Sequence, residues 1–210
     1  MTIQPFLKQP SELQPWDREA VLAWLVEQVP PARLHHILRV EEMACQLAEH
    51  HDLAVDQAAQ AGLMHDLAKY FGPERLLQIA TDQGWTLDPV ELANPHLLHA
   101  PVSAVVAQQE FAVQDQAILD AIRHHTLGKP QMSSLSSVVF LADSLEPGRG
   151  DRPQLEEARH LAQTNLIDAV ACVCDLTLKH LIKTHRLIHP QMVLTRNWAW
   201  QVKQSATLSM

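Results

Sequence analysis

The sequence predicts an all-α protein, and three observations lead to that prediction. One helical pattern follows another along the whole chain. No stretch alternates convincingly between apolar and polar residues, as a half-buried strand would. Ala and Leu are abundant, whereas only 6 of the 210 residues are glycine and only 5% are aromatic. A chain of this length is ample for one domain with a real core.

The first half of the chain shows its helix boundaries mainly through proline. After a loose arm over residues 1–14, a helix is expected in the stretch WDREAVLAWLVEQV, which follows Pro15 and stops at Pro30. Because proline is tolerated in a first helical turn, the next helix is expected to begin at Pro31 and to run to about His50. Asp56 is the expected N-cap of a third helix, QAAQAGLMHDLAKY.

The second half continues with short helices. Pro73 opens ERLLQIATDQ, Gly84 suits its end, and the residues from Asp88 to Glu91 have the spacing of a capping box. The stretch EPGRGDRP (146–153) is expected to be a loop, because it holds two Pro, two Gly and four charges. Helices are expected in APVSAVVAQQEF, DQAILDAIRHHT and SSLSSVVFLADSL, and near 154–163 and 165–183.

Composition limits the classes of partner. The formal net charge is −8 and no Lys/Arg block occurs, so a small-molecule substrate is expected rather than a nucleic acid. No apolar run reaches the roughly 18 residues of a membrane-spanning helix, and the N-terminus lacks a secretory signal pattern. Cys45, Cys172 and Cys174 form no disulfide framework, and we interpret them as buried thiols in a reducing cytoplasm.

Thirteen histidines are unusual, and helical periodicity sorts those that stand in pairs. Neighbours on a helix point roughly 100° apart, so one member of a pair can face the core while the other faces water. His36 shares its face with apolar residues and points inwards, whereas His35 lies on a charged stripe. By the same test His125 points inwards and His124 does not. Asp143 also lies on an apolar face, where an unpaired carboxylate is costly.

The tetrapeptide HDLA occurs twice, and only the second copy suits a site. His51-Asp52 stands where a helix ends, which favours an ordinary role in the turn. His65-Asp66 is expected within a helix, close to the positive charge of Lys69. Gly62 in the same helix indicates close packing against a neighbour.

Three inward histidines and two inward carboxylates together predict a metal site. His99 adds another imidazole at a helix entrance, and we prefer it to His96, which lies in a loop. Imidazole with carboxylate suits Fe, Mn, Zn or Co. Six ligands exceed the need of one catalytic ion and suit two ions that share a bridging carboxylate.

The ordered series formed by these six residues resembles that of HD-domain phosphohydrolases. The flanking segments AGLMHDLAKY, LLHAPVSA, AIRHHTLGKPQMS, LADSLEPGR and IHPQMVLTRN resemble the YqeK family of symmetrical dinucleoside tetraphosphatases. The resemblance covers about residues 30–198. It implies an N-terminal arm and helix over 1–30, an HD-domain helical bundle over 31–198 and a C-terminal tail over 199–210. The sequence departs from the family pattern at Arg39 and His124, neither of which is a ligand position.

The resemblance also implies a function: hydrolysis of diadenosine tetraphosphate to two ADP at a dinuclear centre of the di-iron type, with Mn, Co or Zn as the alternative metals. Asp66 would bridge the two ions, which would generate a hydroxide and hold phosphate oxygens. Lys69 and Arg149 would act with them as cations for the polyphosphate. The metal ligands implied are His36, His65, Asp66, His99, His125 and Asp143.

Further substrate contacts are expected around these groups. Thr126 and Gly128 are candidates to line the pocket, His124 reaches the substrate from beside a ligand, and Glu146 orients a water molecule or Arg149. Two other functions stay open: an HD phosphohydrolase for another nucleotide or alarmone, and a non-catalytic HD module that binds a nucleotide. The sequence also leaves open whether the chain forms a homodimer.

Overall fold

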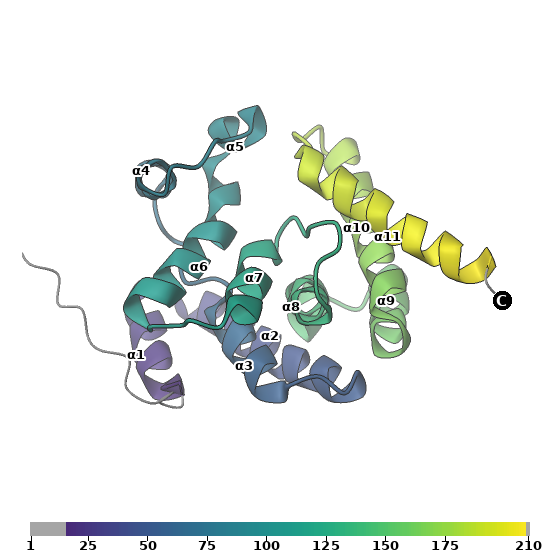
Figure 1. Ribbon diagram of the computed structural model, residues 1–210, viewed down its shortest axis with the longest axis horizontal. Coiled ribbons are helices and arrows are strands. Elements are labelled where there is room, and N and C mark those ends of the chain that lie inside the picture. Colours follow the sequence, from purple (N-terminus) through teal and green to yellow (C-terminus); the bar gives the residue numbers. More distant parts are fainter. Residues whose placement is uncertain (1–15, 209–210) are drawn as a thin grey trace, which may run out of the picture.

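The structure is a computed structural model that describes residues 16–208, and all of its regular elements are helical. No strand occurs in that range, so the predicted all-α class is confirmed (Figure 1). Two short 3₁₀ helices, η1 (Pro95–Leu98) and η2 (Pro147–Arg149), join longer elements. The α-helices are α1 Arg18–Gln28, α2 Pro31–His50, α3 Val55–Met64, α4 Pro73–Asp82, α5 Pro89–Ala93, α6 His99–Glu110, α7 Gln116–His124, α8 Ser134–Leu145, α9 Pro153–Thr164, α10 Leu166–Lys183 and α11 Pro190–Leu208.

The core lies where α2, α3, α7 and α8 pack against one another. Ile37, Leu63, Ile122 and Phe140, one from each helix, are all at most 1% exposed. Gly62 brings α3 close to α2, because a Cβ atom there would lie 3.0 Å from the Cα atom of Glu41. The close packing predicted at this glycine is therefore confirmed.

Local capping explains several helix boundaries. The capping box at the start of α5 is present as predicted, with the side chains of Asp88 and Glu91 each accepting from a backbone N–H. Gly84 follows α4 with φ +68°, which also agrees with the sequence. The N-cap predicted for α3 was wrong: Ala54 occupies that position, and Asp56 lies in the first helical turn.

The second HDLA segment is not helical, contrary to prediction. α3 ends at Met64, and residues 65–70 form consecutive turns. The amide of Lys69 donates to the carbonyl of Asp66 (3.0 Å), three residues earlier, as in a tight turn. The amide of Ala68 donates instead to the Ser103 hydroxyl of α6 (2.9 Å). The helical pattern is therefore interrupted by a hydrogen bond to a distant element.

The C-terminal helix α11 was missed by the sequence analysis, which expected a tail from residue 199. It lies along α10 without interruption across that boundary, at the right of Figure 1. Met192 and Ala199 are buried on its inner face. The expected loop at 146–153 likewise contains the short helix η2. The arm expected at 1–14 lies outside the described residues.

No helix within residues 16–208 combines the length and the apolar content that crossing a bilayer requires. The cysteines Cys45, Cys172 and Cys174 are free thiols, but only Cys174 is buried, and Cys45 and Cys172 are half-buried, contrary to the prediction that all three are buried.

One junction ties α11 to the loop between α7 and α8. Gly128 in that loop has φ +64°, a left-handed conformation that disfavours residues with a Cβ atom. A Cβ atom there would lie 2.4 Å from Thr195 Cγ2 of α11. The Thr195 hydroxyl donates to the carbonyl of Leu127 (2.9 Å). α11 thus fixes the position of the segment that follows His125.

We predict that Gly128→Ala lowers the free energy of unfolding by about 2–4 kcal/mol, because it adds left-handed strain to a steric clash. The matched control is Gly72→Ala, where φ is −64° and no atom lies within 4 Å of the added methyl group. That change should stay within about 0.5 kcal/mol. Urea denaturation of both variants measures the change in the free energy of unfolding. Equal losses of stability in the two variants would contradict this explanation.

Candidate metal centre and the adjoining pocket

Six residues predicted from the sequence converge on one point from five segments. His36 comes from the second turn of α2, His65-Asp66 from the turns after α3, His99 from the start of α6 and His125 from the residue that follows α7. Asp143 comes from the last turn of α8. The four histidines and Asp66 are buried, and the side chain of Asp143 is 19% exposed.

Asp66 lies at the centre of the cluster, and its two oxygens face different pairs of histidines. Its Oδ2 atom lies 4.0 Å from His36 Nε2 and 3.4 Å from His65 Nε2. Its Oδ1 atom lies 3.4 Å from His99 Nε2 and 3.7 Å from His125 Nε2. Two groups capable of holding a metal, His36-His65-Asp66 and Asp66-His99-His125, therefore share this carboxylate.

Three of the histidines are oriented by the same local contact. The Nδ1 atom of His65 pairs with the carbonyl of Gly62 (2.7 Å), three residues earlier. In the same way, His99 Nδ1 pairs with the carbonyl of His96 (2.5 Å), and His125 Nδ1 pairs with the carbonyl of Ile122 (2.8 Å). Because a carbonyl only accepts, each Nδ1 carries the proton, and the Nε2 lone pair faces the cluster.

His36 is oriented by a carboxylate. Its Nδ1 atom lies 2.9 Å from Oε1 of Glu146, which is 1% exposed. Arg39 Nε and the amide of Gly148 donate to the other oxygen of Glu146, both at 2.5 Å. Burial raises the pKa of Glu146, but the hydrogen bonds from Arg39 and His36 outweigh it and lower that pKa to about 2.

The role of Glu146 in orienting a water molecule or Arg149 stays a prediction. Its oxygens contact His36, Arg39 and the amide of Gly148, and its Oε1 atom also forms an ion pair with Arg149 Nε at 4.0 Å. Arg39, one of the departures from the family pattern, instead holds the carboxylate that orients His36.

The donor set fits transition-metal ions. His36 Nε2, His65 Nε2 and Asp66 Oδ1 are buried without a hydrogen-bond partner, which is costly unless a cation satisfies them. Burial lowers the pKa of His99 to about 4 and that of His125 to about 3. Both imidazoles are therefore neutral at pH 7, and neutral imidazole is the form that binds metal.

Three cationic side chains surround the cluster. Lys69 Nζ lies 3.1 Å from His99 Nε2, and Arg149 donates to Asp143 Oδ1 (2.5 Å). The structure thus brings both predicted cations to the site. Arg33, which the sequence analysis missed, donates to Asp66 Oδ2 (3.0 Å). Its position three residues before His36 on the same helix was the signal that could have found it.

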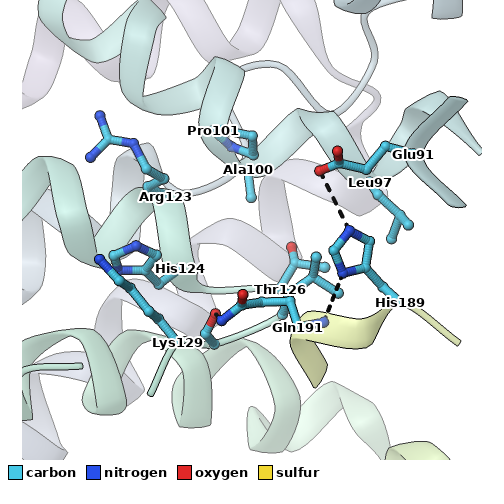
Figure 2. Close-up of a pocket in the computed structure, with 12 residues that line it drawn as sticks. Glu91, Leu97, Ala100, Pro101, Arg123, His124, Thr126, Lys129, His189 and Gln191 are labelled. Atoms are coloured by element: carbon cyan, nitrogen blue, oxygen red, sulfur yellow. Dashed lines mark hydrogen bonds and ion pairs between the residues drawn. The ribbon is translucent and has the colours of Figure 1, made fainter. Parts of the chain in front are cut away.

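A pocket of about 230 Å³ adjoins the cluster and is shown in Figure 2. Thr126 connects the two, because it lines the pocket while its Oγ1 atom lies 3.1 Å from His99 Nε2. The predicted contacts His124 and Gly128 also line it, and burial lowers the pKa of His124 to about 4. Sequence reasoning missed other lining residues, including Glu91, His189 and Gln191.

The first HDLA copy lies away from the cluster. His51 Nε2 pairs with the carbonyl of Ala162 (2.7 Å), and Asp52 is exposed in a turn with φ +52°. Both positions agree with the ordinary role expected for that copy.

Comparison with known proteins agrees with this geometry. The chain is 38% identical over 184 residues to "Bis(5'-nucleosyl)-tetraphosphatase, symmetrical" of Bacillus subtilis, covering 87% of this chain and 97% of that protein. A protein of the same name from Halalkalibacterium halodurans is 33% identical, covering 79% and 87% respectively.

A solved structure is similar along almost its whole length. It is described as a "predicted HD superfamily hydrolase involved in NAD metabolism from Clostridium acetobutylicum", and it superposes with a TM-score of 0.85 at 30% identity. The match covers 89% of this chain and 98% of that one. The HD domain family matches residues 33–148, which include all six residues of the cluster. The chain therefore belongs to the HD-domain family and, within it, to the YqeK family of symmetrical tetraphosphatases.

Proposed function

We propose that this protein hydrolyses diadenosine tetraphosphate, and related dinucleoside polyphosphates, symmetrically to yield two ADP. The observation that carries the proposal is the position of Asp66 between two pairs of inward-facing imidazoles. The names of its relatives in the family support the choice of substrate. The reaction is the metal-assisted hydrolysis of a phosphoanhydride bond.

The proposed ligands divide into two sets. His36, His65 and Asp143 would hold one ion together with Asp66, and His99 and His125 would hold the other, also with Asp66. The 3.1 Å separation between His36 Nε2 and Asp143 Oδ1 supports placing these two in one set. We propose iron as the native metal, although this mixture of nitrogen and oxygen ligands also suits Mn, Co or Zn.

The chain's own contribution is to hold a highly charged substrate. When bound, two such ions supply Lewis acidity, which lowers the pKa of water and offsets charge on phosphate oxygens. Lys69 and Arg149 contact phosphates on either side of the bond that breaks, and the guanidinium of Arg149 can donate two parallel hydrogen bonds. Arg33 adds a third cation next to the bridging carboxylate. The turns around Lys69 and the short helix η2 position these groups at the rim of the cluster.

A second HD-type activity, on another nucleotide or an alarmone, would use the same centre, and analysis of its products would distinguish it. A non-catalytic nucleotide-binding module is disfavoured by the complete set of six ligands, since a module without catalysis has no need to retain all of them.

The first prediction about the activity distinguishes the roles of the two HDLA copies. Asp66→Asn should reduce bound metal from about two ions per chain to fewer than one and should abolish hydrolysis, because an amide replaces the bridging anion. Asp52→Asn is the matched control, since Asn tolerates the left-handed conformation at that position. Metal analysis by plasma mass spectrometry, together with a turnover assay, tests both. Equal losses in the two variants would refute the assignment.

The second prediction concerns Arg149. Losing one charge-assisted phosphate contact costs about 1.5–3 kcal/mol, so Arg149→Ala should lower kcat/KM about tenfold to a hundredfold. Arg149→Lys should recover only part of this, because the planar fork is lost. Steady-state kinetics give the answer, with metal content measured in parallel. Loss of metal in proportion to activity would instead mean that Arg149 supports Asp143.

The third prediction concerns the products. Hydrolysis of diadenosine tetraphosphate should give ADP as the sole nucleotide product, detected by anion-exchange chromatography. A mixture of ATP and AMP would mean asymmetric cleavage and would contradict the proposal. Removal of the metals with a chelator should stop the reaction, and adding back Fe, Mn or Co should restore it.

A further inference from the structure

The pocket beside the metal cluster has two chemically different sides (Figure 2). Arg123, His124 and Lys129 lie on one side, and Glu91 and His189 lie together on the other. Thr126, which contacts the proposed ligand His99, lies nearer the cluster. The basic side suits phosphate. Glu91 and His189 are not among the proposed metal ligands, and the negative charge of Glu91 disfavours phosphate on this side.

His189 presents a fixed hydrogen-bond donor. Its Nδ1 atom accepts from the amide of Gln191 (3.0 Å) and caps the start of α11. In the neutral ring the proton must therefore be on Nε2. That Nε2 atom is buried and has no hydrogen-bond partner, since the nearest carboxylate oxygen, Glu91 Oε1, is 3.7 Å away.

Glu91 presents a fixed acceptor beside this donor. Its Oε2 atom accepts from the amide of Asp88 (2.8 Å) in the capping box of α5. This contact holds the side chain in place and directs Oε1 towards His189. An acceptor and a donor held side by side complement the edge of a nucleobase, and adenine offers its 6-amino hydrogens next to the acceptor N7.

The remaining walls and the size of the pocket also suit a base. Leu97, Ala100, Pro101 and Leu127 supply apolar surface. A volume of about 230 Å³ is below the usual range for drug-sized ligands, roughly 300–1,000 Å³. It therefore suits one nucleoside and not both halves of a dinucleotide.

We propose that this pocket binds one adenosine of the substrate, with Glu91 accepting from the 6-amino group and His189 donating to a ring nitrogen. The inference rests on the proposed function for the identity of the substrate. His189 lies outside the segment 33–148 that matches the HD domain, whereas the metal ligands all lie inside it. Base recognition is thus supplied in part by the residue that caps α11, beyond the segment that carries the metal ligands.

The test measures ligand binding to the metal-loaded protein by calorimetry, with three probes: ADP, inosine diphosphate and inorganic pyrophosphate. Inosine diphosphate carries an oxygen in place of the 6-amino group, and pyrophosphate carries no base. The variants are Glu91→Gln, which keeps an oxygen for the capping box, and His189→Asn, which keeps a side-chain cap for α11. Glu110→Gln and His160→Asn make the same changes at exposed positions and serve as controls.

The native protein should bind ADP more tightly than inosine diphosphate or pyrophosphate. His189→Asn should weaken ADP binding about tenfold and leave pyrophosphate binding unchanged, because only the base contact is lost. Glu91→Gln should reduce the preference for ADP over inosine diphosphate about fivefold or more, since the amide can donate to the 6-oxo group. The two controls should match the native protein.

Other outcomes overturn the inference. If the native protein binds ADP no more tightly than pyrophosphate, the pocket contributes no base recognition. If the variants weaken ADP and pyrophosphate equally, Glu91 and His189 support the structure and do not read the base. Failure of the proposed function is distinguishable, because it would show as absent or asymmetric cleavage of diadenosine tetraphosphate while the selective loss of ADP binding persisted.

Discussion

The burial of the Asp66 carboxylate is the constraint on which the site depends. Its side chain is only 1% exposed, and an uncompensated buried carboxylate costs several kcal/mol. Four imidazoles and two cations approach it within 4.0 Å, and they come from α2, α6, α7 and the turns after α3. Burial raises the pKa of Asp66, but its neighbours, with His65 foremost, hold that pKa well below its usual range. The helices are thus arranged so that positive charge or metal can surround one anion.

The way the histidines are oriented explains why they stand at helix ends. The last carbonyls of a helix have no intrahelical partner. Gly62, His96 and Ile122 each lie near the end of a helix, and their carbonyls pair with the imidazoles three residues later. His36 stands in the second turn of α2, where the backbone carbonyls already accept intrahelical hydrogen bonds. It therefore needs a separate carboxylate, Glu146, and the charge of that carboxylate is in turn balanced by Arg39.

How much of the site could be predicted from the sequence depends on whether a side chain is oriented by its own helix or by a distant element. Periodicity placed His36 and His125 on inner faces correctly, because the direction of a side chain is a local property of a helix. His65-Asp66 was assigned to the site although its segment was wrongly predicted to be helical, since the turn there depends on the Ser103 hydroxyl of α6. Arg33 was missed for a related reason: its contact with Asp66 is set by packing between elements.

The missed helix α11 shows the same limit and has a consequence for specificity. α11 contacts the left-handed residue Gly128 through Thr195, which lies 67 positions later in the sequence. No local sequence pattern connects two residues so far apart. The metal centre lies within the segment that matches the HD domain, whereas His189 and Gln191 lie beyond it. A centre that activates water is indifferent to the base, so selectivity between nucleotides must come from other surfaces. The start of α11 supplies such a surface, and the Gly128–Thr195 junction ties it to the segment that follows His125 of the cluster.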